Sequence, residues 1–210
     1  MRLSTTAFAD AAPMPADYAF CKQDPTSRIT LSLNRNPDFV WSDAPTGTES
    51  FALICHDPDV PSRADDVNQE GRRISATLPR VEFFHWVLID LPRSTSAIAR
   101  GAHADGVTAR GKPGPNAPGG GRHGINDYTA WFANDKEMAG DYYGYDGPCP
   151  PWNDELVHRY VFTLYALDVA KLDVQPRFTG TDARNGMRGH VLAEASVSGR
   201  YSLNPKVRLG

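Results

Sequence analysis

Apolar side chains along this chain gather in short runs separated by turn-forming residues, a pattern that predicts strands more than helices. Residues 28–33 (RITLSL) alternate apolar and polar positions, as expected for a strand with one buried face. Residues 50–55 (SFALIC) and 83–91 (FFHWVLIDL) are nearly continuous apolar runs, which are typical of strands covered on both faces. Residues 158–167 (HRYVFTLYAL) are rich in aromatic and β-branched side chains and predict a fourth strand.

Helical periodicity is credible near the end of the chain. Over residues 182–196, the side chains of Met187, Val191 and Ala195 fall on one helical face, and Gly199 follows as a stop signal. These residues therefore predict a late helix in a mainly β protein.

Three stretches show no regular period. Residues 1–24 predict a loose leader in front of a single domain over 25–210, and residues 61–80 and 93–151 predict long loops. Loops of that length are uncommon in compact domains and are often functional.

The composition is that of a folded chain with nearly balanced charge. Four Trp, eight Tyr and nine Phe supply core material, and 22 basic against 25 acidic residues leave a net charge of -3. This balance favours no nucleic-acid partner. No run of about 18 apolar residues is present, which excludes a transmembrane helix. Asp10 interrupts the small-residue start, so the sequence also predicts no signal peptide.

The three cysteines, Cys21, Cys55 and Cys149, are odd in number and far apart. No CxxC pair is present, which excludes a zinc ribbon or a thioredoxin motif. A reducing compartment is the simplest interpretation, and it predicts a cytoplasmic location.

Candidate chemistry is concentrated beside the predicted strands. Asp57 and Asp59 lie on a proline-stiffened turn directly after the apolar run 50–55, which suits either a binding site or a turn that caps backbone amides. His85 lies inside an apolar run, where a buried imidazole needs a partner. His158 opens a strand and shares one face with Tyr160. Each histidine alone could be structural, but together with the carboxylates they predict a shared pocket.

A proline-rich segment precedes the His158 strand and predicts a rigid pocket rim, made of Gly147, Pro148, Cys149, Pro150 and Pro151. Asp57, Asp59, His85 and His158 are acceptable metal ligands, but no HxH or HExxH spacing supports a metal site. The GGGRHG segment at residues 119–124 lacks the strand and helix of a dinucleotide site. No phosphate-binding loop or GxSxG motif is present, and Cys149 could be redox-active or inert.

Several of these segments occur together in one known family. The run SFALICHDPDVPSR, the strand FFHWVLIDLP, and GPCPP followed by HRYVFTLYALD resemble the phosphatidylethanolamine-binding proteins, also called Raf-kinase-inhibitor-like proteins, of bacterial type. NPDFVWSDAPTGTESFALI and GHVLAEASVSGRYS extend the resemblance over residues 30–201.

The resemblance implies a fold and a pocket. It implies two antiparallel sheets in a sandwich-like arrangement, with peripheral helices, one of them near the C-terminus. It also implies an anion pocket for phosphate or a phosphoethanolamine-type headgroup of a phospholipid, formed by Asp57, Asp59, His85 and His158, with Pro151 and Tyr160 nearby. Bacterial-type members are often homodimers, so a homodimer is expected.

The predicted function is therefore binding without catalysis and without a cofactor. Alternatives are inhibition of a kinase or a serine protease through protein–protein contact and, less favoured, a metal-dependent hydrolase. In the binding hypothesis His85 and His158 titrate between pH 5 and 8 and hold the anion more tightly when protonated, while the carboxylates orient the imidazoles.

Overall fold

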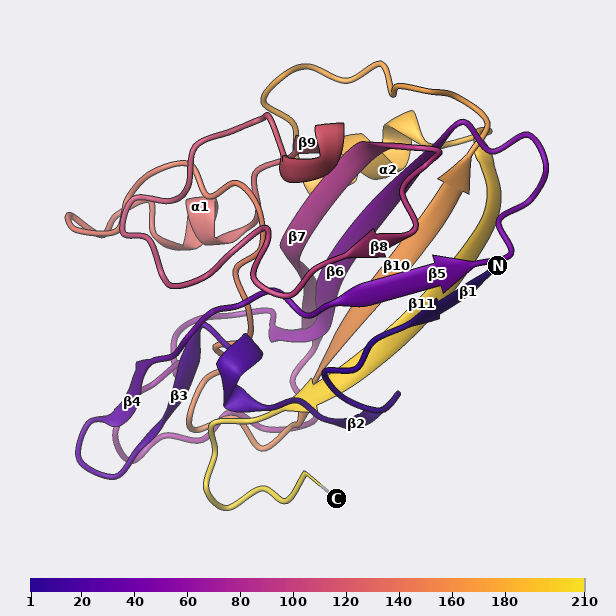
Figure 1. Cartoon of the computed structure of the whole chain (residues 1–210). Helices are drawn as coiled ribbons and strands as arrows, with labels where there is room; N and C mark the ends of the chain where they lie inside the picture. Colours follow the sequence, from indigo (N-terminus) through magenta and orange to yellow (C-terminus); the bar gives the residue numbers. More distant parts are fainter. Residues whose placement is uncertain (210) are drawn as a thin grey trace.

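The computed structural model describes residues 1–209 and has the mainly β architecture that the apolar runs predict (Figure 1). Its strands form one six-stranded, one three-stranded and one two-stranded sheet. In chain order the elements are β1 (Arg2–Ser4), β2 (Ala12–Pro13), η1 (Ala16–Tyr18), β3 (Cys21–Asp24), β4 (Arg28–Leu31), β5 (Phe39–Ser42), β6 (Ser50–Pro61), β7 (Arg80–Pro92), β8 (Ala97–Ile98), η2 (Pro118–Gly120), β9 (Arg122–His123), α1 (Tyr128–Trp131), β10 (His158–Leu167), α2 (Gly180–Gly186) and β11 (Val191–Tyr201).

The six-stranded sheet has the order β2-β11-β10-β6-β7-β9. Its neighbours are antiparallel, except that β2 runs parallel to β11 at Gly199 and Arg200. Strand β6 is apolar throughout its first half because both faces of the sheet are covered there. Phe51, Leu53 and Cys55 point into the larger apolar core, while Ala52 and Ile54 point into a smaller one on the other face.

The larger core lies between this sheet and the three-stranded sheet β1-β5-β8 (Figure 1). Phe39 of β5 packs on Phe162 of β10 with ring centroids 5.0 Å apart, and Trp41 meets Phe51 edge-on at 5.5 Å. Two sheets packed face to face in this way form the sandwich that the resemblance implies.

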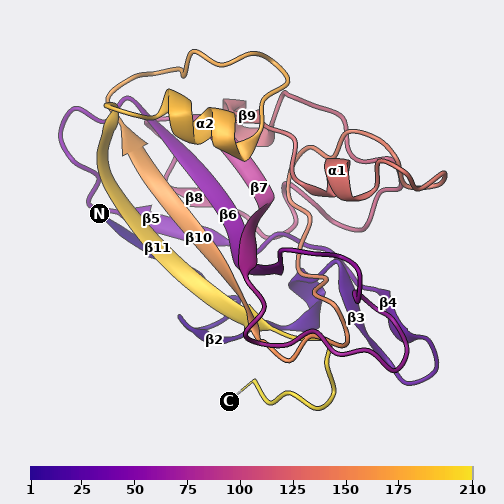
Figure 2. The same cartoon turned by 180° about the vertical axis from the view of Figure 1, so that it is seen from behind.

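Helix α2 covers the smaller core on the opposite face of the six-stranded sheet (Figure 2). Thr179 caps this helix, because its hydroxyl accepts from the backbone N–H of Asp182 while the Asp182 carboxylate accepts from the N–H of Thr179. This reciprocal capping box begins the helix at Gly180.

The two-stranded sheet β3–β4 is a hairpin at one end of the sandwich, and it pairs with no other strand of the described chain (Figure 1). A disulfide between Cys21 and Cys149 attaches it to the segment that precedes β10. The backbone N–H groups of Phe20 and Cys21 both donate to the carbonyl of Pro148, at 2.9 and 3.1 Å. Because an isolated hairpin is only marginally stable in water, these attachments hold it in place.

The prediction of a late helix over residues 182–196 holds only for residues 182–186 and is wrong for the rest. Helix α2 ends at Gly186, and Gly189 follows with a φ of 82°, which turns the chain back. Residues 191–201 then form β11, which pairs antiparallel with β10 along its length. Pairing with an aromatic-rich neighbour outweighs the weak helical periodicity of these residues.

The loose leader predicted over residues 1–24 is also wrong. Strand β1 pairs with β5, and the side chains of Phe8, Met14, Tyr18 and Phe20 are buried in the larger core. The leader lacks a sequence period because its apolar side chains reach the core from short, irregular segments.

Two further predictions need correction. Three sheets are present where two were expected, and the largest contains one parallel pair. Cys21 and Cys149 are not free thiols but a disulfide that spans 128 residues, and only Cys55 is free and buried. Such a pairing leaves no local spacing signal. Disulfides persist mainly in oxidising compartments, so the argument for a reducing compartment loses its basis and the cytoplasmic location stays a prediction.

Candidate ligand-binding cleft

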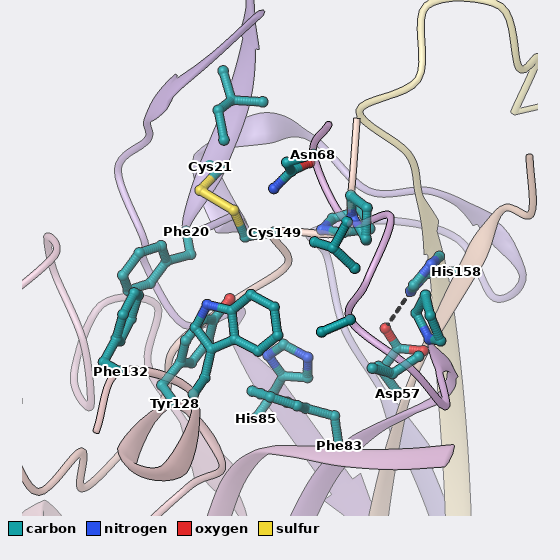
Figure 3. Close-up of a pocket in the computed structure, with 18 of the residues that line it drawn as sticks. Phe20, Cys21, Asp57, Asn68, Phe83, His85, Tyr128, Phe132, Cys149 and His158 are labelled. Carbon is teal, nitrogen blue, oxygen red and sulfur yellow. Dashed lines mark hydrogen bonds and ion pairs between the residues drawn. A yellow bond between two sulfur atoms is a disulfide. The ribbon is translucent and has the colours of Figure 1, made fainter. Parts of the chain in front are cut away.

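A cleft of about 310 Å³ opens where the larger core meets the hairpin β3–β4 and helix α1 (Figure 3). Side chains from at least six parts of the chain line it, and most of them are apolar. They are Phe20, Cys21, Ile29, Leu31, Asp57, Val60, Pro61, Ala64, Val67, Asn68, Phe83, His85, Tyr128, Trp131, Phe132, Met138, Cys149, Pro150, Pro151, His158 and Tyr160.

Strand alternation places two polar groups at the floor of the cleft. Asp57 continues the face of β6 that carries Leu53 and Cys55, and His158 begins the face of β10 that carries Tyr160 and Phe162. The two strands are antiparallel, so the end of β6 meets the start of β10. The polar floor is therefore the continuation of the apolar core at the end of the sheet.

A β-bulge brings His85 to the same cleft. Cys55 pairs with Trp86 and His56 with Phe84, so His85 is the extra residue on β7. Trp86 faces the larger core while Val87 faces the smaller one, and regular alternation would send His85 to the smaller core. A bulge of this kind redirects a side chain, and here it turns His85 toward the cleft.

Charged side chains at the floor form one buried hydrogen-bonded network. His158 Nδ1 lies 2.7 Å from Asp57 Oδ2, and His158 Nε2 lies 3.1 Å from Asp154 Oδ2 (Figure 3 shows the first contact). Arg80 then donates through both terminal nitrogens to the Asp154 carboxylate, at 2.5 and 3.0 Å. Burial alone would lower the pKa of His158, but the charge of Asp57 and hydrogen bonds to Asp154 and Asp57 outweigh it and raise the pKa to about 9.

His85 has the opposite electrostatic character. Its Nδ1 lies 2.7 Å from the backbone carbonyl oxygen of Asp146. A carbonyl can only accept, so Nδ1 carries the hydrogen and Nε2 of the neutral ring keeps a lone pair. Burial lowers the pKa of His85 to about 4, although the charge of Asp57 opposes this shift. The imidazole is therefore neutral at pH 7, with its free nitrogen available to a ligand.

Aromatic rings form one wall of the cleft. Phe20 stacks on Tyr128 with ring centroids 4.6 Å apart, and Tyr128 stacks on Phe132 at 5.5 Å. Leu31 and Trp131 stand at the mouth with 55% and 50% of their surface exposed. The apolar surface of the cleft thus continues to the outside of the molecule.

Most of the predicted site residues meet at this cleft. Asp57, His85, His158, Tyr160, Cys149, Pro150 and Pro151 line it, whereas Asp59, Gly147 and Pro148 do not. Asp59 instead pairs with Arg159, with oxygens 2.8 and 2.9 Å from the guanidinium. Gly147 and Pro148 are buried behind the rim, where their carbonyls accept from the Tyr128 hydroxyl and from the hairpin backbone.

The prediction that both histidines titrate between pH 5 and 8 is wrong. The pKa of His85 lies below that window, at about 4, and the pKa of His158 lies above it, at about 9. His158 also has no nitrogen left for an anion, because both bind carboxylates. The pKa values of the two histidines differ because His85 contacts a backbone carbonyl, whereas His158 contacts two carboxylates.

Sequence reasoning missed Asp154 and Arg80 of the charged network, and it missed the aromatic wall. Asp154 stands four residues before His158, but the irregular backbone between them hides that relation. Arg80, Phe20, Tyr128 and Phe132 lie in segments without a period, so no pattern connected them with the site. Within residues 1–209, no three His, Cys, Asp or Glu side chains form a metal-binding group.

Comparison with known proteins places the chain in a family. A family model described as phosphatidylethanolamine-binding protein matches residues 4–202. The chain belongs to this family. Among the residues described, no helix is long and apolar enough to cross a membrane.

Relatives of this chain occur in an archaeon and in bacteria. A UPF0098 protein of Methanothermobacter thermautotrophicus is 32% identical over 96% of this chain and 98% of the relative. The UPF0098 protein YbhB of Escherichia coli is 29% identical over 80% of this chain and 82% of its own.

Solved structures of family members share the fold. Escherichia coli YbcL, described as a member of the mammalian PEBP family, aligns with a TM-score of 0.67 at 20% identity over 96% of this chain and 97% of its own. The phosphatidylethanolamine-binding protein homologue CT736 of Chlamydia trachomatis aligns with a TM-score of 0.62 at 27% identity, covering 96% of each chain.

Proposed function

We propose that this chain is a non-enzymatic binding protein whose cleft holds a small polar headgroup, of the phosphate or phosphoethanolamine type. The observation that carries this proposal is the construction of the cleft, in which apolar walls surround a small polar floor made of Asp57 and His85. Sites of this kind, mostly apolar with few convergent polar groups, are typical of small-molecule binding.

The lining of the cleft supports binding rather than catalysis. Of its described residues none is Ser, Thr or Lys, and Cys149 is held in the disulfide. His158 has both ring nitrogens engaged, so it has no free position from which to activate a nucleophile. Inhibition of a kinase or protease, and assembly as a homodimer, stay hypotheses.

The polar groups at the floor determine the protonation state in which a phosphate can bind. A dianionic phosphate would meet the Asp57 carboxylate and the lone pair of His85 Nε2, both of which repel acceptors. A singly protonated phosphate offers one O–H donor, and an ethanolamine group offers an ammonium. The proposed headgroup therefore contacts the floor through a donor.

Thermal shift with phosphoethanolamine and with inorganic phosphate tests this function, because a ligand that binds only the folded state raises the melting temperature with concentration. We expect phosphoethanolamine to raise the melting temperature of the natural chain and of the matched control His56→Ala. His56 neighbours Asp57 on β6 but lies outside the cleft, beside Arg184 and Glu82. His85→Ala should abolish the shift. An equal shift in His85→Ala, or none in the natural chain, contradicts the proposal.

A further inference from the structure

The long segment between β8 and β9, residues 99–121, reaches the cleft through one buried carboxylate, that of Asp146. We infer that Lys112 of this segment is a positioning residue, which acts through Asp146 to fix the orientation of the His85 ring and the nitrogen that carries its hydrogen. Lys112 itself does not line the cleft. The inference rests on the proposed binding function and gives a part in it to a segment outside the site.

Asp146 and His85 are joined by two hydrogen bonds. The backbone N–H of Asp146 donates to the backbone carbonyl of His85 at 3.0 Å, and the His85 Nδ1–H donates to the backbone carbonyl of Asp146 at 2.7 Å. The hydrogen bond that one ring nitrogen of a histidine makes determines which nitrogen is protonated. The position of the Asp146 backbone therefore sets what His85 presents to the cleft (Figure 3).

The side chain of Asp146 holds that backbone in place. Its carboxylate is fully buried and accepts hydrogen bonds from three side chains that lie far apart in the sequence. Asn34 Nδ2 donates to Oδ1 at 2.8 Å, Asn126 Nδ2 donates to Oδ2 at 2.9 Å, and Lys112 Nζ donates to Oδ1 at 2.7 Å. Three donors thus converge on one carboxylate next to His85.

Both amides are fixed in the orientation that donates to this carboxylate. Asn34 Oδ1 accepts from the backbone N–H of Gly147 at 2.8 Å, and Asn126 Oδ1 accepts from the backbone N–H of Tyr128 at 3.1 Å. Neither amide can turn its oxygen toward Asp146 without losing that bond. Both oxygens of Asp146 therefore face N–H groups, an arrangement that an ionised carboxylate satisfies and a protonated carboxyl, with its own O–H donor, does not.

Lys112 supplies the charge that this carboxylate needs. Burial raises the pKa of Asp146, and the charge of Lys112 is the largest influence that opposes the shift. Only 17% of the Lys112 side chain and none of the Asp146 side chain is exposed, so solvent screens the pair little. Removal of Lys112 would leave an uncompensated buried charge, which must take up a proton or move toward solvent. Either change disturbs the backbone on which the His85 ring depends.

The backbone directly before Lys112 is held by close packing. Gly111 has a φ of 79°, and a Cβ at this position would collide with the backbone carbonyl of Asp141. A Cβ at Gly140 would collide with the backbone carbonyl of Arg110 in the same way. The two glycines let these segments pack backbone against backbone, so the Lys112 side chain starts from a fixed position.

Two measurements on Lys112→Met test the inference. Nitrogen-15 NMR of histidine-labelled protein at pH 7 shows which ring nitrogen carries the hydrogen, and should find Nδ1 alone for His85 in the natural chain. The variant should show a second population with the hydrogen on Nε2. Its affinity for phosphoethanolamine in titration calorimetry should fall about fivefold, the size of one neutral hydrogen bond. Lys112→Gln, which keeps an N–H donor but no charge, serves the same test where Lys112→Met does not fold.

Arg35→Met is the matched control. Arg35 binds the same long segment from outside, through an exposed ion pair with Asp105 in which Nε and Oδ1 lie 2.6 Å apart. An exposed ion pair contributes little to stability. The His85 spectrum and the affinity for phosphoethanolamine should therefore stay those of the natural chain in this variant.

Chemical rescue separates the charge of Lys112 from its bulk. In Lys112→Cys, alkylation of the new thiol with 2-bromoethylamine expels bromide and restores an ammonium at nearly the length of lysine, whereas iodoacetamide adds a neutral amide. Cys55 is fully buried, and Cys21 and Cys149 form the disulfide, so the new thiol is the one that reacts. The ammonium should recover the natural His85 spectrum and affinity, and the amide should not.

Circular dichroism melting identifies the folded variants, on which the outcome is decided. An unchanged His85 spectrum in folded Lys112→Met, or equal recovery with both reagents, overturns the positioning role of Lys112. If phosphoethanolamine does not bind the natural chain, the proposed function is lost, and the proton position on His85 still decides the role of Lys112.

Discussion

Raising the pH above neutrality should destabilise this protein chiefly through one buried group, His158. Its pKa is raised to about 9 in the fold, against 6.5 for an ordinary histidine. The imidazolium contributes its stabilisation fully below pH 6.5, where the folded and unfolded chains are both protonated. As pH rises from 6.5 toward 9, the unfolded chain has lost the proton that the folded chain still binds, so folding becomes progressively less favourable.

The size of this effect follows from the two pKa values. A difference of about 2.5 units corresponds to about 3.4 kcal/mol at 1.36 kcal/mol per unit. Of this, about 2 kcal/mol should be lost by pH 8 and about 3 kcal/mol by pH 9. No solvent discount applies, because the side chain of His158 is only 1% exposed. The buried histidines with lowered pKa values do not contribute here, because they are neutral in both states above pH 7.

Urea unfolding at pH 6.5, 8 and 9 measures this loss directly. His158→Gln removes the titrating group and should lose most of the pH slope, although two carboxylates left without their partner will lower its stability. Side-chain NMR of the natural chain gives an independent measurement that does not need the variant, and should find His158 protonated at pH 8. A His158 ring that titrates near pH 6.5, with a flat stability profile up to pH 9, would refute the buried ion pair.

Three more predictions concern the rest of the fold. Burial lowers the pKa of His123 to about 3. Its contribution to the free energy of unfolding is therefore complete above pH 6.5 and is lost as the pH falls toward 3. The melting temperature should fall across that range, and it should fall less in the His123→Gln variant. Reduction of the Cys21–Cys149 disulfide, which spans 128 residues, should lower the free energy of unfolding by up to about 5 kcal/mol, and urea curves with and without reductant should coincide only in the Cys21→Ser variant. Thr179→Ala removes the cap of α2 and should cost about 1 kcal/mol in chemical unfolding; an unchanged midpoint would show that packing alone holds the helix.

The strands were predictable because their signals are local. The run at residues 158–167 coincides with β10, and those at 50–55 and 83–91 lie inside β6 and β7. Their apolar periodicity reports burial of each residue independently of its partners. The alternating run at residues 28–33 also located the hairpin strand β4, but the buried face expected for it is not formed, because Leu31 and Leu33 are 55% and 45% exposed.

Long-range geometry was beyond sequence reasoning. The bulge at His85 depends on the pairing of two strands, and the Asp154 contact with His158 depends on an irregular loop. Protonation followed from these partners and not from residue type. The sequence therefore predicted that Asp57, His85 and His158 meet, but not that Asp59 pairs with Arg159 instead, nor which histidine carries a second proton.

The parallel pairing of β2 with β11 has a consequence for how copies of this chain can meet. β2 pairs with β11 only at Gly199 and Arg200, so within the described chain no strand pairs with the outer side of β11 over residues 191–197. An open sheet edge is a template for addition of a further strand, and Val191 and Leu192 are 42% exposed at its start. Glu194 stands exposed at its midpoint. Two copies joined antiparallel about that midpoint would set Glu194 against its own counterpart, and the repulsion between like charges opposes growth of the sheet in this direction.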